Sequence, residues 1–416
     1  MAKDLARVLN FMVTKLYKIL VCVLVVATTC AAYGQGVPYQ SSNQIALSQG
    51  DFGLTSFPSN DVSSTLILGV NDSLDSALTK LSKTQIVTAI SNLTETIRVS
   101  TNDPALLYRR GVYHQLEGEP DKALKDFDTV VQFHPEYFPV FYSRGLLFYE
   151  RGDFTNAILD LTELMQQIPE EIQIRKPRTY ALMHRTRGNA YLRIGDWKRG
   201  IDDLTMAINT ALEGDQTYYG RGCAFGQLGQ KDHALADFSK AIQLNPNNSD
   251  AYSNRGNLFY EGGEIDKAIK DYNEAIRIDS SNGFYYFNRG LAFNRKHDWG
   301  KAKSDYERVI RLNPADSEAC NELAWLLATC PDDSIRNGAE AVAIASKACE
   351  LARWKDWNFL ATLATAYAES GDFAQAVKFQ KMVLSIDKLT EQERKDESQR
   401  LDLFEKKKPY RDKPEQ

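Results

Sequence analysis

Apolar and small residues recur along most of this chain in a helical pattern that repeats every 34 residues. Three segments align without gaps, and they begin at Tyr218, Tyr252 and Tyr286. Within each segment, apolar residues return three or four positions apart over two stretches of about 13 residues, which predicts two amphipathic helices per unit. An Arg-Gly pair marks the register of six units, with spacings of 34, 43, 34, 34 and 34 residues.

The residue types at fixed places in the repeat predict how the two helices pack. In the unit around residue 222, Gly222 and Ala234 are small enough for two helix backbones to approach each other, and Phe225 and Phe238 fill the space beside them. Pro246 ends the second helix, because proline lacks an amide hydrogen and clashes with the preceding turn. One unit cannot bury its apolar face alone, so neighbouring units must stack.

The pattern resembles the tetratricopeptide repeat (TPR), and several positions carry the resemblance. One unit supplies Gly222, Phe225, Ala234, Phe238, Ala241 and Pro246, and another supplies Gly290, Phe293, Ala302, Tyr306, Val309 and Pro314. The resemblance implies an all-α fold: an α-solenoid in which helix-turn-helix repeats coil into a right-handed superhelix, closed by a C-terminal capping helix. The segment from Leu323 to Asn358 is also similar to the last repeats of exported bacterial TPR proteins of planctomycete type.

The repeat register divides the chain into six parts. These are 1–34, a signal peptide or signal anchor; 35–71, a flexible linker; 72–103, an irregular leading helical repeat; 104–316, six clear repeats; 317–388, two divergent repeats; and 389–416, a capping helix and charged tail. Thr390 followed by Glu393 predicts a capping box at the start of the last helix.

Two departures from the pattern carry their own expectations. In the third repeat, Gly200 and Leu212 stand where alanine and proline are usual, which predicts a looser second helix that runs on. The spacing of 43 residues puts nine extra residues at about 170–178. A lengthened helix and loop is the main interpretation of this insert, and a docking element is the alternative.

The N-terminus has the pattern of an export signal. Four basic residues lie within 1–18, and residues 19–32 are apolar or small. Such a run is shorter than the roughly 20 residues of a spanning helix and matches a signal peptide that ends in Ala32-Tyr33-Gly34. We expect export to the periplasm or secretion. An uncleaved anchor in the inner membrane through residues 19–32 and lipidation of Cys30 are the alternatives.

Charge and motifs exclude several classes of function. The net charge is -5, and the first 34 residues carry +3, so the rest of the chain is about -8 (-5 minus +3). A mildly acidic body argues against binding nucleic acid. The sequence has no phosphate-loop, HExxH or GxSxG motif, and its five histidines have no ligand spacing. We therefore predict no catalytic residue, cofactor or metal, and no membrane contact except through an uncleaved anchor.

The four cysteines of the exported part leave two interpretations open. Cys320 and Cys349 fall near helix ends that antiparallel packing brings together, and an exported protein can oxidise them. Buried reduced thiols at these positions, and at Cys223 and Cys330, are the simpler alternative.

Each marker arginine has an aspartate 16 residues later, which predicts a ladder of ion pairs between the two helices of a repeat. The pairs are Arg110 with Asp126, Arg144 with Asp160, Arg187 with Asp203, Arg221 with Asp237, Arg255 with Asp271 and Arg289 with Asp305. The two positions lie at the same level of an antiparallel pair, and the aspartate of the preceding repeat is a further candidate partner. A charged binding stripe is the alternative interpretation.

The resemblance also implies a peptide-binding wall made by the first helix of each repeat. Its positions hold Tyr108, Tyr142, Tyr149, Tyr219, Tyr260, Phe284 and Phe287, interleaved with Asn189, Asn254, Asn257, Asn288 and Asn294. Solvent-facing aromatics supply contact area, and asparagine can both donate to and accept from a peptide backbone. Aromatics that contact one another across the bore and a small-molecule site are the alternatives.

These features predict a non-catalytic protein–protein interaction scaffold that binds an extended peptide or partner segment in the concave groove. The alternative is a structural or assembly protein of the cell envelope that acts through its outer face or ends.

Overall fold

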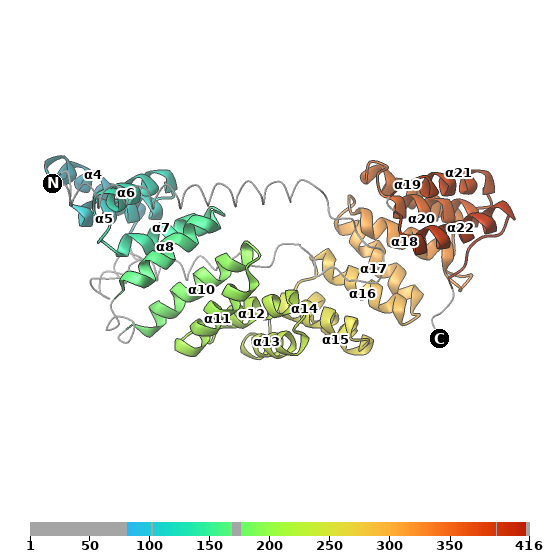
Figure 1. Cartoon of the computed structure of the whole chain (residues 1–416), viewed down its shortest axis with the longest axis horizontal. Coiled ribbons are helices and arrows are strands. Elements are labelled where there is room, and N and C mark those ends of the chain that lie inside the picture. Colours follow the sequence, from blue (N-terminus) through green and yellow to red (C-terminus); the bar gives the residue numbers. More distant parts are fainter. Residues whose placement is uncertain (1–80, 101–102, 169–175, 388, 413–416) are drawn as a thin grey trace, which may run out of the picture. The chain divides into compact units, whose positions relative to one another are not determined.

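The computed structural model describes residues 81–100, 103–168, 176–387 and 389–412, and every regular element in these ranges is a helix (Figure 1). The first helices of successive repeats are α5 (Pro104–Leu116), α7 (Pro139–Glu150), α10 (Pro177–Arg193), α12 (Asp215–Gln227), α14 (Ser249–Glu261), α16 (Gly283–Arg295), α18 (Ser317–Thr329) and α20 (Trp357–Glu369). The second helices are α6 (Pro120–Phe133), α8 (Phe154–Gln167), α11 (Trp197–Thr210), α13 (Lys231–Leu244), α15 (Ile265–Ile278), α17 (Trp299–Leu312), α19 (Gly338–Leu351) and α21 (Phe373–Leu384). Helix α4 (Lys83–Val99) precedes them and α22 (Glu391–Glu405) follows.

Each first helix packs on the second helix of its own repeat and on the second helix of the repeat before it. The close approach within a repeat depends on the marker glycine. A Cβ atom on Gly222 would lie 2.9 Å from Phe238, and one on Gly256 would lie 2.8 Å from Tyr272. Because core side chains leave no room for such an atom, the aromatic ring of the second helix fixes the separation of the pair.

The second helix of the third repeat does not run on as its sequence predicts. Helix α11 ends at Thr210 after 14 residues, as α13 and α15 do in their own repeats. Leu212 is buried and packs with Ala181 and Ala207, and its amide donates to the Ala207 carbonyl at 3.0 Å. Leu212 therefore follows the end of α11 with its side chain buried in the core, at the position where other repeats have proline.

The repeat with the longer spacing begins with a lengthened helix. Helix α10 spans 17 residues from Pro177, whereas α12 spans 13. Residues 169–175, which hold most of the expected insert, lie outside the described residues.

The C-terminal helix closes the stack. The capping box predicted at Thr390 is present, with the Glu393 amide donating to the Thr390 hydroxyl at 3.3 Å. Phe404 is fully buried against Ala364, Ala368 and Ala376 of the last repeat. An apolar side chain on a strongly charged helix thus covers the last hydrophobic face, which a solenoid needs for solubility.

The expected signal segment, the linker and the first part of the leading repeat lie outside the described residues. Of the leading repeat, α4 is described, and it packs on α5. Among the helices that the structure describes, none combines the length and hydropathy needed to cross a bilayer.

Candidate functional site

Each marker arginine donates two parallel hydrogen bonds to the second helix of its own repeat. In all six repeats, Nε and Nη2 of the arginine donate to the two carboxylate oxygens of the aspartate 16 residues later, at 2.6–2.9 Å. This two-pronged geometry is the strongest that a guanidinium and a carboxylate can form, and it fixes the rotation of one helix against the other.

The same guanidinium also reaches the preceding repeat. Its Nη1 atom donates to a polar side chain on the second helix before it, at 2.6–3.4 Å. The acceptors are Thr94, Asp128, Thr162, Thr205, Ser239 and Asn273, in chain order. The ion-paired aspartate of the preceding repeat, expected as a further partner, is not the acceptor. From Asp128 onward, the acceptor stands two residues after that aspartate, where a polar residue recurs in the sequence.

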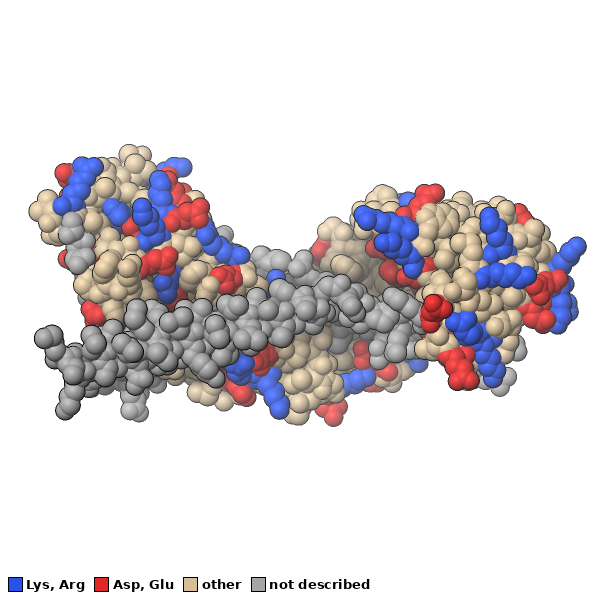
Figure 2. Space-filling model, turned by 45° about the horizontal axis from the view of Figure 1, so that its top comes forward, with Lys and Arg blue, Asp and Glu red and all other residues tan. Residues whose placement is uncertain are grey.

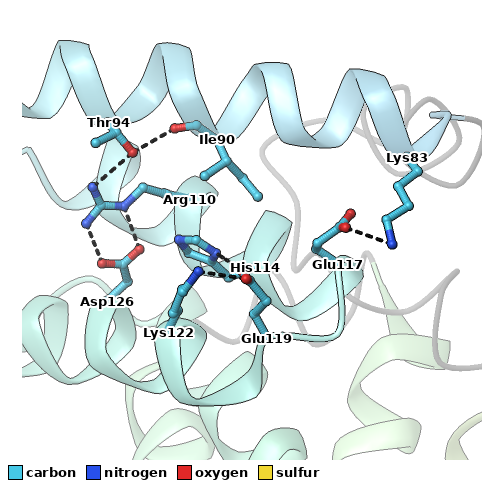
Figure 3. Close-up of polar contacts among 9 residues, drawn as sticks. All are labelled: Lys83, Ile90, Thr94, Arg110, His114, Glu117, Glu119, Lys122 and Asp126. Carbon is cyan, nitrogen blue, oxygen red and sulfur yellow. Dashed lines mark hydrogen bonds and ion pairs between the residues drawn. The ribbon is translucent and has the colours of Figure 1, made fainter.

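Figure 3 shows the first rung of this ladder. Arg110 lies between Asp126 and Thr94, whose hydroxyl donates to the Ile90 carbonyl at 2.7 Å while it accepts from Arg110 at 3.4 Å. Helix α4 therefore occupies the place of a second helix in front of the first clear repeat.

The ladder is more buried than exposed ion pairs are. Its aspartates expose only 5–7% of their side chains and its arginines 14–20%. Burial raises the pKa of Asp160, and the Arg144 guanidinium offsets part of that rise. A desolvated carboxylate of this kind is strongly destabilising once its partner is removed.

The predicted binding residues all lie on first helices, but most of them do not face solvent. Tyr108, Tyr142, Tyr149, Tyr219, Tyr260, Asn189 and Asn257 are buried; Phe287, Asn254, Asn288 and Asn294 are half-buried; and Phe284 is exposed. The expectation of solvent-facing tyrosines is therefore wrong for all five of them.

Two of the tyrosines contact the first helix of the next repeat. The Tyr108 hydroxyl lies 3.0 Å from the Ser143 hydroxyl, and Asn254 Nδ2 donates to the Tyr219 hydroxyl at 3.0 Å. Asn257 Oδ1 accepts from Asn288 Nδ2 at 3.0 Å. The polar groups expected to bind a peptide backbone are thus engaged by the next repeat.

One polar group of the predicted set, on Asn189, is not engaged in this way. Asn189 Oδ1 is buried and finds no hydrogen-bond donor in the described ranges. Gly220 stands where the next repeat would supply a side chain, and a Cβ atom on it would lie 3.4 Å from Asn189 Oδ1. The glycine therefore interrupts the series of polar contacts along the first helices.

The exposed part of the predicted set lies on α16. Phe284 exposes 55% of its surface, and Phe287 and Asn288 follow three and four residues later on the same face of the helix. A large aromatic in solvent beside half-buried polar groups is a typical contact point for a partner protein.

Cysteine and metal chemistry contribute little here. Cys223, Cys320, Cys330 and Cys349 are all buried free thiols, and burial raises the pKa of Cys223 and Cys349 to about 12. In the part of the chain that the structure describes, no three His, Cys, Asp or Glu side chains gather as a metal site would require.

A second polar surface on the first helices was missed in the sequence. It lies on α18 and α20 and consists of Trp325, Thr329 and Glu369, with Arg400 of α22 beside them. The chain's own residues 409–412 lie against this surface, which we call the tail groove. No periodic pattern marks it, because Asp412 lies 87 and 83 positions from Trp325 and Thr329, and none of the tail residues belongs to a repeat.

Acidic side chains line the neighbouring face of α18. Burial, followed by the negative charges of Glu318 and Asp412, raises the pKa of Glu322 to about 7. Burial and the charges of Asp356 and Asp316 raise the pKa of Glu318 to about 7 as well. Elsewhere, on the face drawn in Figure 2, basic and acidic side chains are interspersed.

Paired helices stacked through a repeated arginine contact define an α-solenoid. Models of the tetratricopeptide repeat match this chain at residues 216–248, 238–270 and 256–297. Residues 216–297 therefore contain tetratricopeptide repeats, and repeats of this kind are generally non-catalytic modules of protein–protein interaction.

Solved structures with a similar arrangement show low identity. The C-terminal part of a TPR repeat-containing protein from Cytophaga hutchinsonii is 17% identical over 62% of this chain and 98% of that chain, with a TM-score of 0.48. MamA from Desulfovibrio magneticus is 20% identical over 42% and 97%, with a TM-score of 0.39. YrrB, described as a TPR protein with an unusual peptide-binding site, is 19% identical over 46% and 95%, with a TM-score of 0.38.

No conclusion about this chain rests on these structural likenesses. No curated protein matches the sequence.

The ladder predicts that replacing a ladder arginine lowers the free energy of unfolding far more than replacing an exposed arginine. We expect Arg255→Met to lower the free energy of unfolding by about 2–4 kcal/mol, because it leaves the buried Asp271 carboxylate without its partner. Arg277→Met is the matched control, since its pair with Glu274 is exposed and screened by solvent, so its loss should change the stability little. Urea unfolding measures both values, and equal losses would contradict the prediction. Replacing Asp271 by leucine in the Arg255→Met variant should restore much of the stability.

The raised pKa of Glu322 predicts a pH-dependent stability. A carboxyl whose pKa is higher in the folded state than its usual 4.5 favours folding while it is protonated, and this contribution is lost as the pH rises through about 7. Glu322→Gln should therefore raise the melting temperature at pH 8 and leave it nearly unchanged at pH 5. The control is Glu350→Gln, an exposed position on α19. A Glu322→Gln effect of the same size at both pH values would refute the interpretation.

Proposed function

We propose that this protein is a non-catalytic scaffold that binds an extended peptide or partner segment on the wall formed by its first helices. The observation that carries the proposal is the docking of an extended segment, the chain's own residues 409–412, on the first helices α18 and α20. A wall that holds one extended segment through side-chain and backbone contacts has the chemistry to hold another.

The exposed aromatic on α16 supports the same proposal further along the wall. Phe284 has no place in the stack of repeats, and Asn288 beside it already donates one of its amide hydrogens to Asn257 and is half-buried. Such a surface offers an apolar contact next to a rigidly held polar group, which suits a partner with a large side chain and a free backbone.

The test uses a matched pair of exposed phenylalanines. Phe284 exposes 55% of its surface on a first helix, and Phe133 exposes 54% at the end of the second helix α6. Dodecapeptides displayed on phage are selected on the full chain, and the affinities of the selected peptides are then measured for both alanine variants. We expect Phe284→Ala to weaken a group of these peptides at least tenfold and Phe133→Ala to leave their affinities unchanged, with equal melting temperatures. Peptides that bind both variants like the parent would count against this wall.

We also propose that the protein acts outside the cytoplasm, either released or held by residues 19–32. The support is the basic N-terminal segment, the 14 apolar or small residues and the small residues before Gln35. N-terminal sequencing of the protein from fractionated native cells tests this. We expect a mature chain that starts near Gln35, or an intact chain in the membrane fraction. An intact N-terminus in the soluble cytoplasmic fraction would refute export.

A further inference from the structure

The segment after the last helix returns to the first helices. Lys407 turns the backbone, with a φ of 53°, and residues 408–412 then continue without helical structure. The segment reaches α18, where the Asp412 amide donates to the Thr329 carbonyl at 3.0 Å. This contact joins the backbone of an extended segment to the end of a first helix.

Three successive side chains of this segment are each recognised separately. The Tyr410 ring lies 5.8 Å from the Trp325 ring, and the Arg400 guanidinium stacks on both, at 5.0 Å from Trp325 and 5.2 Å from Tyr410. Two further contacts complete the set: Arg411 pairs with Glu369 at 2.5 Å, and the Asp412 carboxylate accepts from Trp325 Nε1 at 2.8 Å and from the Thr329 hydroxyl at 2.9 Å. The aromatic Tyr410 thus contacts an aromatic ring, the basic Arg411 pairs with a carboxylate, and the acidic Asp412 accepts hydrogen bonds from two donors.

The docked segment is held less firmly than the helix before it. Phe404 of α22 is fully buried, whereas residues 409–412 are all half-buried; Tyr410 packs at the edge of the cluster around Phe404, and Arg411 and Asp412 are held by polar contacts that water can replace. Asp412 also lies close enough to Glu322 for its charge to raise the pKa of that carboxyl. A like charge near Asp412 weakens docking, so the tail is suited to exchange.

The wall beside the tail has further polar groups. Asn321 Oδ1 and Thr362 Oγ1 are buried, and neither has a hydrogen-bond partner among the residues that the structure describes. Asn321 precedes Trp325 by four residues and therefore lies on the same face of α18. Both atoms are shielded from solvent and are not open to a ligand in this arrangement.

We propose that the tail groove is a recognition site for a partner segment in which an aromatic, a basic and an acidic residue follow one another, and that residues 409–412 occupy it as a built-in competitor. This inference rests on the proposed function and names the site and the chemistry of its ligand. The charge complementarity of Arg411 with Glu369, and of Asp412 with the two donors, sets the order of the three residues.

The experiment empties the groove and supplies the segment in trans. The probe is a fluorescein-labelled peptide with the sequence of residues 406–416, and its binding to the full chain is followed by fluorescence anisotropy. The variant Tyr410→Ala/Arg411→Ala/Asp412→Ala removes the competitor. We expect it to bind the probe at least tenfold more tightly than the parent chain does. Adding Glu369→Gln to this variant should reverse most of the gain, because the basic residue of the probe then loses its partner.

Two controls separate recognition from general effects. The variant Lys407→Ala/Lys408→Ala changes two exposed residues of the same segment and should bind the probe like the parent. A second probe with alanine in place of its tyrosine and aspartate should not bind the emptied groove. If the triple variant does not fold, Asp412→Asn alone is used, with a smaller gain expected in the same direction.

Three outcomes would overturn the proposal. A folded triple variant that does not bind the probe makes the tail a fixed part of the fold, and equal binding of both probes removes the specificity. Dimers of the parent chain that form through exchanged tails would make a second copy the occupant instead of a partner. None of these outcomes affects the test of α16 with Phe284, so partner binding on that part of the wall is tested separately.

Discussion

The contact on which the clear repeats depend is a guanidinium shared among three helices. Arg255 is anchored on its own first helix, grips Asp271 of the second helix with two bonds, and reaches Ser239 of the repeat before it. A single rigid fork therefore fixes the pairing within a repeat and the stacking between repeats at once. Because the aspartates paired within each repeat are buried, any other register would leave a carboxylate unpaired, and the cost of that error selects one arrangement.

The two divergent repeats replace this contact with apolar packing. Leu323 and Leu363 stand where the marker arginines would be, and both are buried in one hydrophobic cluster with Ala324 and Phe359. The charges reappear on the wall, as Glu318, Glu322 and Glu369 of α18 and α20. In these two repeats, the charged side chains therefore lie on the wall of first helices and not between the two helices of a repeat. There they can attract a basic group.

Sequence patterns were informative where one period governs the contact. A spacing of 16 residues places Arg289 and Asp305 at one level of a helix pair, so the ladder could be predicted from helical geometry alone. The burial of the tyrosines could not be predicted in this way, because it depends on how closely a neighbouring repeat approaches. Gly220, which stands where other repeats have a longer side chain, changes that approach locally. The contact of Trp325 with Asp412 was also out of reach, because it joins residues 87 positions apart that belong to no repeat.

The same geometry decides where on the wall a partner can bind. Between α12 and α14, Tyr219 and Asn254 bond to each other, and any ligand there would have to break a half-buried contact that stabilises the stack. From α16 onward the wall carries groups that the stacking of repeats does not use, first Phe284 and then Trp325, whereas Glu369 also pairs with Arg336 of the preceding repeat at 3.1 Å. The chain covers Trp325 with its own half-buried tail. Under the proposed function, a partner segment therefore binds where side chains of the first helices are not used for stacking, at Phe284 on α16 and at Trp325 on α18.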